Sequence, residues 1–228
     1  MIKIFIAVCL ALIISITEYV SKRLDLKNKP YYMKILSFSA GFSITYLLLE
    51  LLPLFAEAAF SISKFLFLAL LLGFISHHVV EKEIYKHNKR HELVKMLNLE
   101  ENIFYYAYHL ILGLVLFLFI NSNMVEGIFF ALSIFAFTIV SNLPSAPHRS
   151  KERMMILSSS TFVGALLGIL LANIIPIWVE FTLIGIVAGV LMFTVTRHHI
   201  PYRRKGNIQY FILGFLIYAI IIISKWFL

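Results

Sequence analysis

The chain has 228 residues, of which 61% are hydrophobic and only 14% are charged, and it carries a formal net charge of +8. This composition excludes a water-soluble globule, because there are too few polar side chains to cover its surface. The positive charge does not indicate a nucleic-acid partner, since the basic residues are scattered over short segments between apolar runs. The sequence therefore predicts an all-α, multi-pass membrane protein whose main partner is the lipid bilayer.

Eight apolar runs are long enough for transmembrane helices, which need roughly 17–25 residues. They cover approximately residues 2–20, 33–56, 62–80, 103–120, 125–143, 154–173, 180–197 and 207–227. These runs leave no room for a soluble domain, so residues 1–228 are predicted to form a single transmembrane domain with a cytoplasmic loop at 81–102. The first run lacks a small-residue cleavage site and is interpreted as a mature helix rather than a signal peptide.

The positions of lysine and arginine predict the orientation of the chain. All but three of the 20 basic residues lie in or beside the connections that follow the first, third, fifth and seventh runs. The exceptions are Lys3, Lys64 and Lys225. Because basic residues favour the cytoplasmic side, both termini are predicted to be extracytoplasmic, with the protein in the plasma membrane.

Two distant stretches share a pattern of small residues followed by proline. Ala40-Gly41 precedes Pro53 in the second run, and Ala188-Gly189 precedes Pro201 after the seventh, at the same interval. The two runs are predicted to cross the membrane in opposite directions, so the stretches would be inverted copies. Inverted repeats are typical of transporters, whose substrate site lies near the middle of the membrane. The alternative is a chance match, because glycine and proline are common in membrane helices.

Together these features resemble the ZIP family of divalent-metal transporters. The likeness covers nearly the whole chain, and the stretch from Phe38 to Pro53 is similar to the family's second helix, which often reads AGxxL…LLHLLPE. Residues 164–168 and 188–201 are similar to its sixth and seventh helices. The resemblance implies eight helices in a 3+2+3 inverted repeat. It also implies a transporter rather than an enzyme, a divalent cation such as Zn²⁺ as substrate rather than cofactor, and a homodimer as a candidate assembly.

The fourth and fifth runs depart from the family where its metal ligands lie. The family's fourth helix carries HNxxDG, and the matching run from His109 to Gly113 keeps only the histidine. The fifth helix carries HxxPEG, and here Ser141 and Ser145 replace its His and Glu. Pro144 is retained, and Asn142 offers an oxygen ligand. Zinc-type ions prefer about four ligands, mainly His and carboxylate, so the family's two-metal site is expected to be lost.

His109, Asn142 and Ser141 are nevertheless the first candidate metal ligands. His109 and Asn142 are predicted at similar depths on antiparallel helices, so the two could meet. A metal or proton role for His109 has an alternative, in which a neutral imidazole is hydrogen-bonded to Asn142 or Ser141 as part of the packing.

Further candidates are Glu50, His87 and His91. An unpaired carboxylate in hydrocarbon is costly, which makes Glu50 a functional candidate near the outer surface. If the third helix continues into the loop, His87 and His91 share a face with Glu83 and could hold zinc; a solvated charged helix is the alternative. Glu18, near the inner end of the first run, is expected to pair with Lys22 or Arg23.

Two functions follow from this reading. The preferred one is a divalent-cation permease of ZIP-like fold. The other is a relative that keeps the fold but has lost transport and acts as a structural or regulatory membrane protein. An intramembrane enzyme is not expected, because the sequence has neither an HExxH motif nor a Ser–His pair with an orienting acid.

Overall fold

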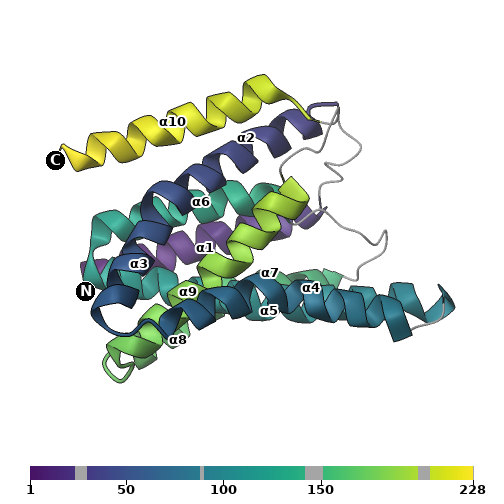
Figure 1. Ribbon diagram of the computed structural model, residues 1–228, viewed down its shortest axis with the longest axis horizontal. Coiled ribbons are helices and arrows are strands. Elements are labelled where there is room, and N and C mark those ends of the chain that lie inside the picture. Colours follow the sequence, from purple (N-terminus) through teal and green to yellow (C-terminus); the bar gives the residue numbers. More distant parts are fainter. Residues whose placement is uncertain (24–29, 88–89, 142–150, 200–205, 228) are drawn as a thin grey trace.

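The computed structural model describes residues 1–23, 30–87, 90–141, 151–199 and 206–227, which form helices and short connections without a β-strand. In chain order the helices are α1 (Ile2–Arg23), α2 (Tyr32–Tyr46), the π-helix η2 (Leu47–Leu51), α3 (Leu52–Ser61), α4 (Leu66–His87), α5 (Arg90–Ser122), α6 (Met124–Ser141), α7 (Lys151–Ser158), α8 (Ser160–Leu171), α9 (Ile177–Thr194), the π-helix η3 (Val195–His199) and α10 (Ile208–Trp226). Figure 1 shows one bundle with both termini at the same end. The predicted all-α class is confirmed.

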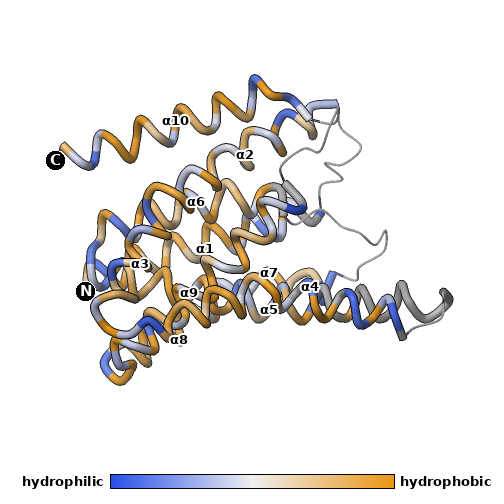
Figure 2. The backbone as a smooth tube through the Cα atoms, viewed as in Figure 1, coloured by the Kyte–Doolittle hydropathy of each residue, from blue (hydrophilic) through white to orange (hydrophobic). Residues whose placement is uncertain are grey.

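Six helical segments of the described residues are long and apolar enough to cross a membrane. They are Ile2–Ser21, Tyr32–Ser61, Asn102–Ser122, Lys151–Leu171, Ile177–Arg197 and Ile208–Trp226. Figure 2 shows apolar residues along the length of the helices and hydrophilic residues mainly towards their ends. The chain is therefore a multi-pass membrane protein. Two of the eight predicted spans are not among these six: α6 has only a shorter apolar stretch, Met124–Ile139, and no segment of α4 is included.

The segment at 81–102, predicted as a loop, is mostly helical. α4 continues to His87 and α5 begins at Arg90, so both helices extend beyond the rest of the bundle, at the end away from the termini (Figure 1). Lysine, glutamate and leucine are good helix formers without being apolar enough to mark a membrane span. The common face of Glu83, His87 and His91 was predicted on the condition that one helix continues through them; His87 is the last residue of α4 and His91 belongs to α5, and the side chains of both histidines lie outside those described.

Glycines allow two parallel helices, α2 and α10, to pack closely. A Cβ atom on Gly41 would collide with the carbonyl oxygen of Phe211, and one on Gly214 with that of Phe38. Backbones that approach so closely gain van der Waals contacts that lipid cannot replace, which is how membrane helices commonly associate.

A second parallel pair, α4 and α9, has the same kind of crossing. Here a Cβ atom on Gly189 would meet the carbonyl oxygen of Leu70, and one on Gly73 would meet that of Ile186. Ile186 and Gly189 of α9 lie at one common interval after Phe38 and Gly41 of α2. Phe211 and Gly214 of α10 likewise lie at one common interval after Leu70 and Gly73 of α4. The two crossings therefore use equivalent residues.

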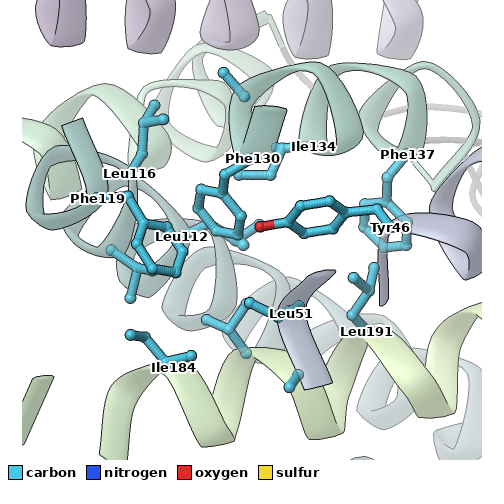
Figure 3. Packing of buried hydrophobic residues seen from close by; sticks show 14 of the residues in the cluster. Tyr46, Leu51, Leu112, Leu116, Phe119, Phe130, Ile134, Phe137, Ile184 and Leu191 are labelled. Carbon is cyan, nitrogen blue, oxygen red and sulfur yellow. The ribbon is translucent and has the colours of Figure 1, made fainter. Parts of the chain in front are cut away.

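The same spacing separates the two π-helices. η2 lies between α2 and α3, and η3 follows α9. Each π-helix begins the same number of residues after its Ala-Gly pair, Ala40-Gly41 for η2 and Ala188-Gly189 for η3. The helices run in opposite directions, because α3 packs against α9, with Phe55 against Gly185, whereas the earlier α2 contacts the later η3. Figure 3 shows Tyr46, Leu51, Ile184 and Leu191 of these helices in the same cluster of buried side chains. The predicted opposite directions of the second and seventh runs agree with this packing, although Pro201 lies outside the described residues.

Candidate functional site

One face of α1 brings a carboxylate into the interior of the bundle. The buried residues of this helix recur every three or four positions: Ala7, Ala11, Ile14, Glu18 and Ser21. The opposite face is exposed and apolar, with Leu12, Ile13, Ile16 and Val20. Because the small alanines allow α1 to approach α6 and α8, Glu18 on the same face is completely buried.

Glu18 meets an imidazole from α5 and a hydroxyl from α8. The Nδ1 atom of His109 contacts Oε1 of Glu18 directly, and the two residues are 1% and 0% exposed. The hydroxyl of Thr161 donates to the same Oε1 atom at 2.8 Å. Nδ1 of His109 lies 3.2 Å from this hydroxyl oxygen. Three helices thus meet at one carboxylate oxygen, and we call these residues the Glu18–His109–Thr161 cluster.

Aromatic side chains fix the plane of the His109 ring. Tyr105, one turn earlier on α5, stacks on the imidazole with ring centroids 4.1 Å apart. Tyr108 meets the imidazole edge-on, with centroids 5.6 Å apart. Such contacts restrict ring rotation, so the direction of Nδ1 towards Glu18 is set by packing as well as by charge.

The second oxygen of Glu18, Oε2, belongs to a buried carboxylate but takes no part in these contacts. Oε2 is buried and has no hydrogen-bond partner among the described residues. A carboxylate oxygen without a partner is costly in a membrane interior, and such groups usually mark functional sites.

Because Glu18 lies on the buried face of α1, its described partner is His109, which was not expected from the sequence. The expected partners were Lys22 or Arg23, and the side chain of Lys22 is outside those described. His109 is buried, as a polar residue in hydrocarbon requires. Its predicted partners are not tested: Asn142 lies outside the described residues, and only the backbone of Ser141 is described, at the end of α6.

Glu50 belongs to a different cluster, at the end of the bundle that carries the termini. Its Oε1 atom is paired with Nζ of Lys225, in the last turn of α10. The same Nζ lies 3.8 Å from Oε1 of Glu126, in the first turn of α6. The Glu18–His109–Thr161 cluster lies nearer the opposite end, where α1 ends and α8 begins. The structure therefore does not bring Glu50 together with His109.

The side chains of the other predicted ligands are outside the described part of the structure, so their relation to the two clusters is not tested. His87 ends α4 and His91 lies in the first turn of α5, and neither side chain is among those described. Within the described part of the chain, no group of three His, Cys, Asp or Glu residues could hold a metal ion. The described cluster at His109 offers one imidazole, one carboxylate and one hydroxyl, so a cation bound there would need water or further ligands.

Thr161 was not recognised from the sequence. It lies on a buried face of α8 whose other residues are small, among them Gly164, Ala165 and Gly168. A polar residue on a small-residue helix face is a usable signal, because such faces are the ones that pack against other helices. Comparisons with protein families, curated proteins and solved structures gave no match for this chain.

Proposed function

We propose that this protein is a transporter of ZIP-like architecture that carries a divalent cation of the zinc type across the plasma membrane. In this proposal eight helices form a 3+2+3 inverted repeat, with α5 and α6 as the central hairpin and both termini extracytoplasmic. The first three spans are related to the last three by a two-fold axis in the membrane plane.

The observation that carries the proposal is the equivalence of the α2–α10 and α4–α9 crossings. A chance similarity of sequence does not require equal spacing at four glycines and at two π-helices. A structural repeat does require these equal spacings, because corresponding residues occupy corresponding positions in the two halves. Inverted repeats of antiparallel halves are characteristic of transporters, in which one part of the bundle moves against another.

Buried charge supports a cation as the substrate. Glu18 and Glu50 are acidic groups held inside or at the margin of an apolar bundle, and acidic residues in membrane spans commonly mark cation or proton pathways. Glu50 lies towards the end that carries the termini, and Glu18 towards the other end. We place the cation path between these two positions, past His109.

The second candidate is a relative of the same architecture without transport. It is favoured by one observation: both carboxylates already have a basic partner in the chain, Lys225 for Glu50 and His109 for Glu18. In such a protein the two clusters would only hold helices together, and the membrane protein would serve a structural or regulatory role.

Flux measurements on purified protein in sealed proteoliposomes separate these functions. We expect the wild-type protein to carry Zn²⁺, Mn²⁺, Fe²⁺ or Co²⁺ faster than empty vesicles, as followed by a trapped metal-sensitive dye. His109→Ala should abolish flux while the protein remains folded. His78→Ala is the control, because His78 is an exposed histidine on α4 that contacts Arg197 rather than either carboxylate, and it should leave flux unchanged. Wild-type protein that carries none of these ions favours the second candidate.

A further inference from the structure

The direction of the His109 ring has a chemical consequence. A neutral imidazole carries one proton, and the hydrogen bond made by one nitrogen determines which nitrogen keeps the lone pair. Nδ1 of His109 faces Oε1 of Glu18, which as a carboxylate oxygen accepts a hydrogen bond. The proton therefore belongs on Nδ1, and the lone pair belongs on Nε2, the nitrogen on the far side of the ring.

We propose that Glu18 is a positioning residue that holds His109 as the Nδ1–H tautomer and thereby presents Nε2 as the ligand for the transported cation. That the species bound by Nε2 is a divalent cation rests on the proposed function. The tautomer itself follows from the contact between the two side chains.

Thr161 gives the carboxylate a defined position. Its hydroxyl donates to Oε1 of Glu18 at 2.8 Å, so this oxygen is held by a donor from α8 as well as by the imidazole. α8 in turn is fixed against α1, since the backbone N–H of Phe162 donates to the hydroxyl oxygen of Ser15 at 3.2 Å. The carboxylate, the hydroxyl and the imidazole are thus pre-arranged by three packed helices.

A carboxylate is more than packing requires at this place. A neutral amide of the same shape could meet Nδ1 with either its oxygen or its NH2 group, so it would not decide which nitrogen of His109 carries the proton, whereas an ionised carboxylate can only accept. Glu18 also leaves its buried Oε2 atom without a partner among the described residues. What a carboxylate adds is negative charge, which makes the imidazole a stronger electron-pair donor. Histidines that ligate metals commonly donate their second N–H to a carboxylate for this reason.

The first test measures the tautomer directly. We suggest recording ¹⁵N imidazole shifts of the purified, isotope-labelled protein at pH 8, with His109→Gln to assign the signal. The expected result is a protonated Nδ1 and an unprotonated Nε2 in the wild type, and a mixture of tautomers in Glu18→Gln. Glu57→Gln, at an exposed carboxylate on α3, should leave the signal unchanged. A wild-type lone pair on Nδ1, protons on both nitrogens, or a tautomer unaffected by Glu18→Gln would overturn the proposal.

The second test measures metal binding without transport. Co²⁺ is titrated into the protein in detergent and followed by its visible absorption. Loss of the carboxylate charge in Glu18→Gln should weaken binding roughly 10–100-fold, as expected for a carboxylate behind a ligating histidine. Thr161→Ser keeps the hydroxyl and should bind as the wild type does, whereas Thr161→Val should bind more weakly. Wild-type protein that binds no Co²⁺, or Glu18→Gln protein that binds it equally well, overturns the ligand role of Nε2.

The two proposals fail separately. An unchanged tautomer in Glu18→Gln together with wild-type flux overturns the positioning role and leaves transport standing. A tautomer that depends on Glu18, in a protein without flux for any of the ions, supports the positioning role and overturns transport. Should Glu18→Gln fail to fold, Thr161→Val keeps the carboxylate and tests the same arrangement. It should keep the Nδ1–H tautomer, because the carboxylate still accepts, but bind Co²⁺ more weakly; a mixed tautomer, or binding as tight as in the wild type, would count against the proposal.

Discussion

Nζ of Lys225 contacts Oε1 of Glu50, so an ion pair links the last turn of α10 to the π-helix η2. The two side chains are only 20% and 11% exposed, and Glu126 adds a second carboxylate 3.8 Å from the same Nζ. This cluster joins three elements at the end of the bundle that carries both termini.

We expect Lys225→Met to destabilise the protein, because Glu50 would lose its counter-ion in a largely apolar setting. Loss of one partner of a fully buried pair costs about 3–5 kcal/mol, and partial exposure should reduce this to roughly 1–3 kcal/mol here. Exchange of the charges in Glu50→Lys with Lys225→Glu should recover part of the loss. Unfolding in detergent measures the change, with Lys64→Met as a control at an exposed lysine. An exchange variant no more stable than Lys225→Met would contradict the ion pair.

The Glu18–His109 pair should behave as one energetic unit. Glu18→Leu alone leaves a buried imidazole without its acceptor, and His109→Leu alone leaves a buried carboxylate, so each should cost about 3–5 kcal/mol. The double variant leaves neither group unpaired and should cost less than the two single changes together. Equilibrium unfolding of all four proteins measures the coupling. Additive losses would mean that the two side chains do not interact.

The helices themselves were largely predictable from hydropathy, because a membrane span needs a long apolar run whatever it packs against. The polar extension of α5 was not predictable in this way. Residues 90–102 are helical without being apolar, so a search for membrane spans placed the start of the helix near 103. Helix propensity, rather than hydropathy, describes such a segment.

The position of Glu18 was partly encoded in the sequence. Ala7, Ala11, Ile14 and Glu18 recur at intervals of three or four, which is the spacing of one helix face. Charge pairing one turn away favoured Lys22 instead and did not point to His109. The contact with His109 could not be read from the sequence, because it depends on how α1 and α5, two distant helices, pack in three dimensions.

The equivalent glycine crossings predict matched effects of substitution. Gly41→Ala and Gly189→Ala each place a Cβ atom against a backbone carbonyl, which cannot move away as a flexible side chain can. Each change should therefore destabilise the protein by at least about 1–3 kcal/mol, the usual range for overpacking. Ala107→Val, at an exposed position of α5, is the control and should have little effect. Thermal unfolding measures all three, and a tolerated alanine at either glycine would contradict the close crossing.

Topology can be tested with single cysteines, because Cys9 is the only native cysteine. In a Cys9→Ser background, Lys64→Cys and Asn173→Cys place thiols in connections predicted to be extracytoplasmic. Lys82→Cys and Arg153→Cys place them at exposed positions predicted to be cytoplasmic. The physical reason is the concentration of lysine and arginine on the second side, since basic segments are retained in the cytoplasm. A membrane-impermeant maleimide should therefore label the first pair in intact cells and the second pair only after permeabilisation. Labelling of Lys82→Cys from outside would reverse the orientation, and with it the direction in which the proposed cation path opens.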